Sequence, residues 1–208
     1  MDSKLAEYTR LLTGWPGVAS RPDQALVEDS LVLLQYLERA RRLIDVGSGG
    51  GMPGLPLALA RPDLAVTLLE AEHNKAAFLV HCVARLGLAN VHVVSERAET
   101  AARSSLRETF DVATCRALAA LPVLAELCLP FVRVGGRLLA MKSGPEPDDG
   151  AVGLLGGGTV QVLPAPSAAR TGGVILAAGK LAPTPDRFPR RPGVPNRRPL
   201  KTKSRRPR

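Results

Sequence analysis

Ten residues, DVGSGGGMPG at 45–54, constrain the fold of this chain more than any other stretch. They directly follow the apolar pair Leu43-Ile44 and contain five glycines within eight residues, four of which, Gly47, Gly49, Gly51 and Gly54, are the positions expected to require glycine. Glycine adopts positive φ angles easily and lets a ligand approach the main chain closely. We therefore expect a β-strand that ends in a glycine-rich turn against a nucleotide, the corner that is typical of a doubly wound α/β sheet.

The segments after this turn fit the same fold. Short apolar runs alternate with helical patterns and predict strands at 42–46, 65–70, 91–95, 110–114 and 136–141, with helices at 53–60, 74–86, 99–105 and 118–130. Strands this short, with little polar alternation, are typical of a parallel sheet that is buried on both faces. Two weaker strand candidates, 159–163 and 173–178, follow a glycine-rich stretch and are expected to close the sheet as an antiparallel hairpin.

Both ends of the chain differ in composition from this middle part. Apolar residues at helical spacing near the N-terminus, and a second helical pattern from about 23 to 41, predict a helical cap over residues 1–41. Residues 42–180 would form the Rossmann-like domain. Seven prolines follow Lys180, so residues 181–208 are expected to be a basic, Pro-rich tail that adds no element to the core.

The formal net charge of +9 is concentrated in that C-terminal region. Residues 187–208 hold ten Lys or Arg and no acid, which leaves 18 basic against 19 acidic residues before them, a net charge of −1. A basic tail on a nearly neutral body indicates a polyanionic partner, bound through counterion release, rather than a basic enzyme surface. A tail that merely keeps the protein in solution is the alternative.

Cysteine usage and hydropathy exclude several other classes of protein. Cys82, Cys115 and Cys128 lie far apart, with no CxxC pair and no clustered histidine, so neither a disulfide framework nor a zinc site is indicated. No stretch approaches the roughly 18 apolar residues that a membrane span needs, and the N-terminus does not resemble a signal peptide. We expect a cytoplasmic protein with no metal centre and no membrane partner.

Two kinds of cofactor fit the glycine-rich turn. Gly49-x-Gly51-x-x-Gly54 satisfies the generic dinucleotide pattern, which makes an NAD enzyme one candidate. Pro53, however, removes one of the helix N-terminal amides that would bind a pyrophosphate. The opening at 45–49, an acidic strand end that leads into Gly-Ser-Gly, is instead the usual start of an S-adenosylmethionine site in Rossmann-like methyltransferases.

Two later segments would complete such a site. Glu70 ends the second predicted strand about 20 residues after the glycines, where a carboxylate can accept hydrogen bonds from both ribose hydroxyls. Ala98 and Glu99 follow the third strand, where this fold usually contacts the adenine edge. The structural alternatives are a solvated strand-end acid for Glu70 and a helix N-terminal acid for Glu99.

With these motifs in place, the chain closely resembles the bacterial 16S rRNA guanine-N7 methyltransferase family, historically called glucose-inhibited division protein B. The resemblance covers nearly the whole length. It rests on the LxxYxxLLxxW-like start at 5–15, Asp29-Ser30, DVGSGGGMPGLPLALARPDL at 45–64, LLEAEHNKAAFL at 68–79, Ser95-x-Arg97-Ala98-Glu99, Cys115-Arg116-Ala117 and Ala140-Met141-Lys142. The ending FPRRPGVPNRRPL at 188–200 is also similar to members of this family.

The resemblance implies S-adenosylmethionine-dependent methylation of guanine N7 in the 16S rRNA of the small ribosomal subunit, by a monomer. The residues that would contact the cofactor or flank the target base are Gly47, Gly49, Gly51, Met52, Ala98, Glu99 and Arg116, and Glu70 would hold the ribose. Arg116 would position the guanine through O6 or a phosphate, and Lys142 would meet RNA phosphate. Guanine N7 has a lone pair and no proton, so the reaction would need alignment and no general base.

The sequence departs from the family pattern at several places, among them a shorter N-terminal helical region and the lack of an Arg-His pair near the last strand. Ala25 and Leu26 stand where members usually carry an Arg-His pair, and Ser143 separates Lys142 from the glycine that usually follows it. Two other functions therefore stay open at this stage. One is an S-adenosylmethionine-dependent methyltransferase that acts on a small molecule or a protein, and the other is an RNA-binding relative that has lost its activity.

Overall fold

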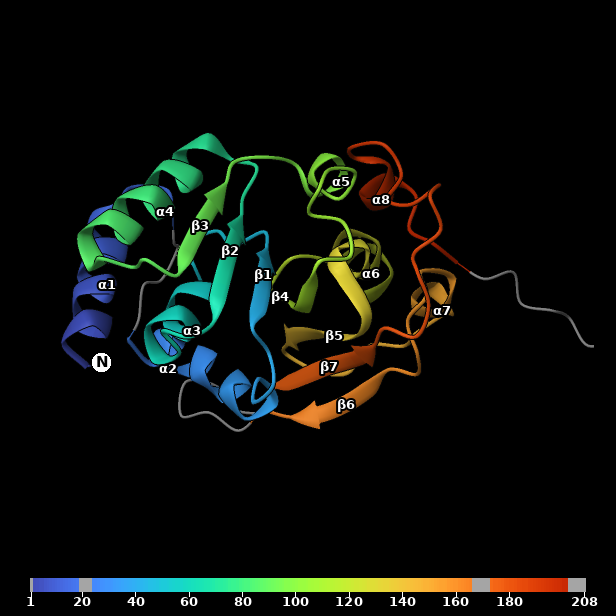
Figure 1. Cartoon of the computed structure of the whole chain (residues 1–208), viewed down its shortest axis with the longest axis horizontal. Helices are drawn as coiled ribbons and strands as arrows, with labels where there is room; N and C mark the ends of the chain where they lie inside the picture. The colour runs from blue at the N-terminus through green and yellow to red at the C-terminus, as the bar shows by residue number, and fades with distance from the viewer. Residues whose placement is uncertain (1, 19–23, 166–172, 202–208) are drawn as a thin grey trace, which may run out of the picture.

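A mostly parallel, seven-stranded sheet forms the centre of the molecule (Figure 1). The computed structural model describes residues 2–18, 24–165 and 173–201. The strands are β1 (Arg42–Val46), β2 (Ala65–Leu69), β3 (Val91–Val94), β4 (Phe110–Arg116), β5 (Val132–Lys142), β6 (Gln161–Pro164) and β7 (Val174–Gly179), in the order β3-β2-β1-β4-β5-β7-β6. Strands β1 to β5 are parallel, whereas β7 runs antiparallel to both β5 and β6. The predicted α/β class and its antiparallel closing pair are confirmed.

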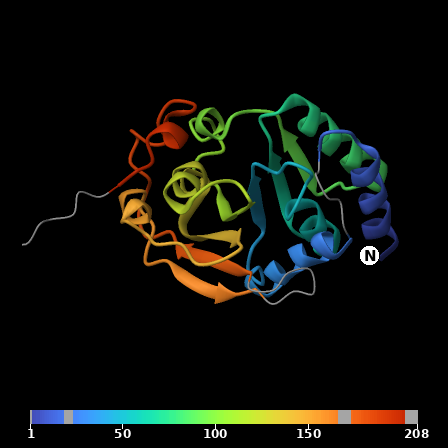
Figure 2. The ribbon, with the colours of Figure 1, turned by 180° about the vertical axis from the view of Figure 1, so that it is seen from behind.

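Helices cover both faces of the sheet, as Figures 1 and 2 show from opposite sides. The helices are α1 (Asp2–Gly14), α2 (Gln24–Asp29), α3 (Gly54–Ala60), α4 (His73–Leu86), α5 (Ala98–Ala101), α6 (Leu121–Cys128), α7 (Ala151–Leu154) and α8 (Val194–Arg197), with 3-10 helices at Ser30–Tyr36 and Leu129–Phe131. Adjacent residues of β1 point to opposite faces, so Leu43 packs with the helices α1 to α4 and Ile44 with α5 to α7. None of the helices that the structure describes has both the length and the apolar character needed to cross a membrane.

The N-terminal region is helical, as predicted, but its second helix is shorter and broken. The pattern at 23–41 predicted one continuous helix, whereas α2 ends at Asp29 and a 3-10 helix runs from there to Tyr36. The Ser30 hydroxyl donates a hydrogen bond to the Leu26 carbonyl oxygen at 3.4 Å. A serine that bonds back onto the preceding turn competes with regular helix geometry, which accounts for the change at this residue.

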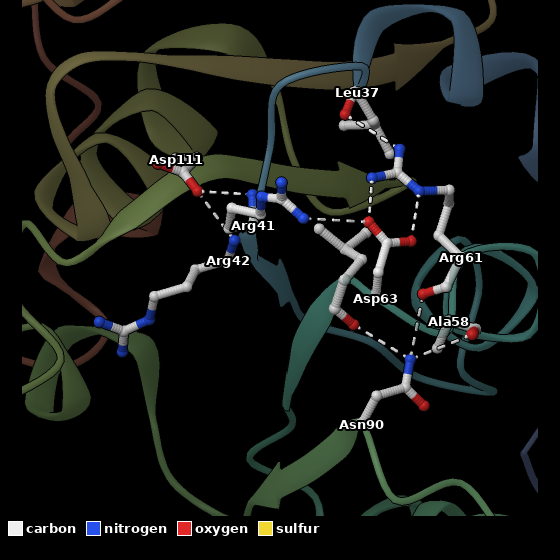
Figure 3. A network of polar contacts seen from close by, with 9 residues as sticks. Leu37, Arg41, Arg42, Ala58, Arg61, Asp63, Asn90 and Asp111 are labelled. Atoms are coloured by element: carbon white, nitrogen blue, oxygen red, sulfur yellow. Dashed lines mark hydrogen bonds and ion pairs between the residues drawn. The ribbon is translucent and has the colours of Figure 1, made fainter.

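Polar side chains fix the amino ends of the parallel strands (Figure 3). One Asp111 carboxylate oxygen accepts hydrogen bonds from the amides of Arg41 and Arg42, both at 2.8 Å. Asn90 donates to three carbonyl oxygens, one in the last turn of α3 and two between α3 and β2, at 3.0 to 3.2 Å. These side chains satisfy backbone groups at the amino-terminal edge of the sheet. A ligand site is therefore expected at the opposite edge, where the parallel strands have their carboxyl ends.

The expectation that residues 181–208 add nothing to the core is wrong for the part that the structure describes, 181–201. Phe188 is 5% exposed and packs in the same hydrophobic cluster as α6. The Arg107 guanidinium donates to the carbonyl oxygens of Thr184 and Phe188, at 2.6 and 3.0 Å. Proline removes backbone donors but leaves carbonyl acceptors, and here an arginine from the body satisfies two of them, so the segment folds onto the domain with only the short helix α8 as regular secondary structure.

A substitution of Phe188 tests whether this segment belongs to the folded domain. We expect Phe188→Ala to lower the free energy of unfolding by about 3 kcal/mol, because it removes a buried aromatic ring and leaves a cavity. Leu181→Ala is the matched control, since Leu181 is 71% exposed in the same segment and its loss should cost less than about 0.5 kcal/mol. Urea denaturation followed by circular dichroism measures both, and equal effects would contradict the packing.

The side chain of Asp45 connects β1 to the start of α3 beneath the glycine-rich turn. It is fully buried, and its Oδ2 accepts a hydrogen bond from the Gly54 amide at 3.1 Å. Its Oδ1 has no hydrogen-bond partner among the described residues. Burial raises the pKa of the Asp45 carboxyl to about 7, against the opposing hydrogen bonds from Gly54 and Ser48. The turn is therefore held by an acid that titrates near neutral pH.

This raised pKa predicts a pH dependence of stability with a defined sign. The folded state binds the Asp45 proton more tightly than the unfolded state does, so protonation of Asp45 stabilises the fold. This contribution is fully present below about pH 4 and is lost as the pH rises through about 7. Asp45→Asn cannot ionise, so its stability relative to the wild type should increase by about 2–3 kcal/mol between pH 5 and pH 8. Denaturation curves of both proteins at the two pH values give this difference, and a constant offset would refute it.

Candidate functional site

A cavity of about 620 Å³ opens at the carboxyl ends of β1, β2 and β4. Its volume lies within the range of sites that hold a cofactor or a small ligand. The chain leaves β1 toward β2 on one side, and β4 lies on the other side, so the cavity sits where the strand order reverses. This switch point is where open α/β sheets bind their ligands.

The structure brings most of the predicted site residues together around this cavity. Those that line it are Gly47, Gly49, Met52, Glu70, Ala98, Glu99 and Arg116. Gly51 and Lys142 do not line it. A Cβ at Gly51 would lie 2.4 Å from the Leu55 Cδ1, so this glycine is needed for packing against α3. The Lys142 ammonium donates to the Ala119 carbonyl oxygen at 2.8 Å and pairs with Glu146.

The glycine-rich turn has the left-handed backbone that its composition predicted. Gly47 and Gly49 have φ angles of +70° and +56°, which other residues adopt only with strain. The amides of Gly47 and Ser48 both donate to the carbonyl oxygen of Leu69 at the end of β2, at 2.8 and 3.1 Å. The turn is thus fastened to the neighbouring strand and presents its inner surface to the cavity.

Helix α1 supports the same turn from outside. The Tyr8 hydroxyl is fully buried and donates a hydrogen bond to the Gly50 carbonyl oxygen. A Cβ at Gly50 would lie 2.8 Å from Leu12 and 3.4 Å from Val18, so a larger residue would separate the turn from α1. The N-terminal helix therefore belongs to the framework that shapes the site.

The Glu70 carboxylate is positioned by the backbone and borders the cavity. Its two oxygens accept hydrogen bonds from the amides of Gly49 and Glu72, both at 2.8 Å, and the residue is 8% exposed. It is therefore not a solvated strand-end acid. Each carboxylate oxygen has a second acceptor site, so a group held in this way can still accept the two hydroxyl hydrogens of a ribose.

Arg116, at the end of β4, joins the cavity to the N-terminal helices. Its Nη1 donates to the Leu26 carbonyl oxygen at 2.9 Å and lies 3.7 Å from the carboxylate of the buried Asp29. The side chain of Leu26 lines the cavity as well. The place where relatives usually carry an Arg-His pair is thus occupied here by an apolar residue at the wall of the site.

Glu99 connects α5 to the C-terminal segment, which the sequence analysis did not expect. It is 2% exposed, and its Oε1 accepts a hydrogen bond from the Gly193 amide at 2.8 Å. This bond places α8 beside the cavity, and Asn196 of α8 lines it. Leu26, Lys75 and Leu118 also line the cavity, although no motif in the sequence marks them as site residues. The only signal for Asn196 was its presence in the FPRRPGVPNRRPL segment that carries the family resemblance.

The groups around the cavity favour some chemistries over others. No histidine or cysteine lines it, and no group of three potential metal ligands occurs within 2–18, 24–165 and 173–201. Cys82 is buried, and burial raises the pKa of its thiol to about 12, so it is not an activated nucleophile. At the start of α3 the Gly54 amide bonds to Asp45 and the Leu55 amide to Gly51, so these donors are not available to a pyrophosphate. The site fits a ligand that carries a ribose and no phosphate better than it fits NAD.

Comparison with known proteins agrees with this geometry. The solved apo structure of the S-adenosylmethionine-dependent methyltransferase SibL matches with a TM-score of 0.62 and 17% identity, over 86% of this chain and 70% of that one. A putative O-methyltransferase from Klebsiella pneumoniae matches with a TM-score of 0.60 and 19% identity, over 88% and 91%. At this level of identity, the similarity shows only that this chain has the same fold, which is the Rossmann-like class I methyltransferase fold.

Sequence relatives give the family. The family model described as rRNA small subunit methyltransferase G matches residues 20–151. The ribosomal RNA small subunit methyltransferase G of Rubrobacter xylanophilus is 41% identical, over 96% of this chain and 84% of that protein. The protein of the same name from Moorella thermoacetica is 45% identical, over 84% and 76%. This chain belongs to the rRNA small subunit methyltransferase G family.

Proposed function

We propose that this protein transfers a methyl group from S-adenosylmethionine to N7 of a guanine in the 16S rRNA of the small ribosomal subunit. The observation that carries the proposal is the Glu70 carboxylate, held by the amides of Gly49 and Glu72 at the mouth of a glycine-lined cavity. Family membership supplies the RNA substrate class. We further propose that the enzyme acts as a monomer in the cytoplasm.

The lining residues fit S-adenosylmethionine part by part. Glu70 would accept the ribose hydroxyls, and the turn at Gly47 and Gly49 would lie along the amino-acid portion. Ala98 and Glu99 would border the adenine. When bound, this cofactor supplies an electrophilic methyl group on a sulfonium cation. The carboxylates of Glu70 and Glu99 at the cavity wall complement its positive charge.

The chemistry requires the protein to position the guanine rather than to remove a proton. Guanine N7 offers a lone pair and carries no hydrogen, which agrees with a lining that contains no histidine. Holding the attacking atom in line with the methyl carbon converts an encounter into a near-unimolecular step. We propose that Arg116, oriented by Leu26 and Asp29, donates hydrogen bonds to guanine O6 or to a phosphate beside it.

Lys142 takes a different part in this proposal from the one its motif suggested. It pairs with Glu146 at 2.5 Å and donates to the Ala119 carbonyl oxygen. Ala119 follows Ala117 and Leu118, which line the cavity. We propose that Lys142 fixes this loop and acts on catalysis through its position, without contact with RNA phosphate.

Direct assay of methyl transfer tests the proposed function. Small ribosomal subunits from cells that lack the gene should accept tritiated methyl from S-adenosylmethionine, and nucleoside analysis should identify 7-methylguanosine at one position. Labelling of protein or of small molecules instead would establish a different methyltransferase. Binding of S-adenosylmethionine and RNA without transfer would establish a relative that has lost its activity.

Substitution of Glu70 tests the ribose contact. We expect Glu70→Ala to weaken S-adenosylmethionine binding by at least about 10- to 100-fold, because the loss of even one hydrogen bond to a charged acceptor costs about 1.5–3 kcal/mol. Glu70→Gln keeps acceptor oxygen and shape and should lose less. Isothermal titration calorimetry measures both affinities. A wild-type affinity in Glu70→Ala would remove this residue from the cofactor site.

Substitution of Arg116 separates positioning from cofactor binding. Arg116→Ala should leave the cofactor affinity within a few-fold of the wild type but lower single-turnover methylation by about 100-fold, because misplaced reacting atoms lose that order of rate. Arg116→Lys keeps the charge without the planar fork and should restore little. Arg137→Ala, at an exposed position in the middle of β5 that does not line the cavity, is the matched control. Intact turnover in Arg116→Ala would contradict the mechanism.

A further inference from the structure

The C-terminal segment 186–201, here called the strap, reaches the cavity although it lies far from it in sequence. Figures 1 and 2 both show α8 beside α5, at the edge where the arrows of β1 and β2 end. Asn196 of α8 contributes to the cavity lining. Nothing in the proposed function so far assigns a role to the strap or to this residue.

The strap is held in place by buried polar contacts, not by loose packing alone. Glu126 of α6 is completely buried and receives hydrogen bonds from the amide, Nε and Nη2 of Arg190, at 2.6 to 3.1 Å. Gly193, with a φ of +77°, donates its amide to Glu99. Burying a carboxylate is costly unless its geometry and partners are good. These contacts therefore define one position for the strap, with α8 next to the cavity.

The strap lies between α5, whose Glu99 accepts the Gly193 amide, and α6, which carries Glu126. The turn at 47–49 and Glu70 come from β1 and β2, on one side of the switch point. Arg116 comes from β4, on the other side, and α8 packs on α6, which follows β4. Asn196 thus lines the cavity where the wall of Glu99 meets the elements that follow β4, the strand that carries Arg116.

The side chains of the strap match two parts of a flipped-out nucleotide. A carboxamide carries both a donor and an acceptor and can pair with the edge of a guanine, which presents O6 and N1–H side by side. Asn196 is the carboxamide in the described lining. Arg197 and Arg198 follow it directly and are exposed, as phosphate contacts require.

We propose that the strap is the substrate-side wall of the site, with Asn196 hydrogen-bonded to the target guanine and Arg197 and Arg198 on the flanking phosphates. This inference rests on the proposed function for the identity of the base. In this proposal the strap is a folded surface, not a flexible basic tail, and it presents RNA contacts at a fixed distance from the cofactor residues.

Asn196→Ala tests the base contact. We expect its melting temperature and its S-adenosylmethionine affinity, measured by calorimetry without RNA, to stay close to the wild type, and single-turnover methylation of small subunits to fall by at least about tenfold. Gln161→Ala, which removes an exposed carboxamide on β6, is the matched control and should keep full activity. An unchanged rate in Asn196→Ala overturns the proposal. An equal loss of cofactor affinity also overturns it, because it would place Asn196 on the cofactor side.

A second measurement tests the strap without any methyl transfer. The double variant Arg197→Ala/Arg198→Ala should reduce the slope of log affinity against log salt for 16S rRNA by about 1.5–2, since each lost phosphate contact removes roughly one released counterion. Arg187→Ala is the control, because it also removes an arginine from the strap. The Arg187 guanidinium stacks on Phe188, 5.0 Å from the ring centroid, so this variant should change the slope little. A double variant with the wild-type slope overturns the strap as an RNA contact. If the wild type binds this RNA but methylates nothing, the proposed function fails while the strap result stands.

Discussion

The hydrogen bond from the Gly49 amide to the Glu70 carboxylate is the contact on which the site depends. It joins the turn after β1 to the end of β2, and thereby connects the two backbone segments that border the cavity. Asp45 holds the far end of the turn through Gly54, and Tyr8 holds its outer surface through Gly50. A glycine-rich turn is costly to order, because glycine loses more conformational entropy on folding than any other residue. Three buried side chains offset this cost.

The sequence predicted the parallel sheet and its ligand edge because both depend on local signals. Apolar runs of four to six residues and a cluster of glycines predict strands and a turn without knowledge of any distant partner. Glu70 could be placed for the same reason, since a residue at a strand end must lie at the carboxyl edge. The roles of Gly51 and Lys142 could not be separated from those of their neighbours. Tertiary packing decides that Gly51 lies against Leu55 and that Lys142 bonds to Ala119, and no local pattern shows either contact.

The strap shows the limit of such reasoning most clearly. Its prolines remove the periodicity by which buried segments are recognised. The contacts that fix it on the domain are to residues far away in the chain, such as Arg107, Glu126 and Glu99. The charge count was misleading in the same way. Arg190 contributes to the basic total of this region, yet its charge is neutralised by a buried glutamate instead of facing a partner. Net charge describes a surface only once the buried pairs have been removed from it.

Glu99 is where the two halves of the site meet. It was expected to contact adenine or to act as a helix N-terminal acid, but its carboxylate also accepts the Gly193 amide at the start of α8. The same residue borders the cavity, so a change in its orientation would act on both the cofactor side and the strap. Because Glu99 is 2% exposed, its carboxylate cannot turn away into solvent without breaking that bond. The position of the proposed substrate wall is therefore tied to the proposed cofactor wall, which is the arrangement that in-line transfer between two bound molecules requires.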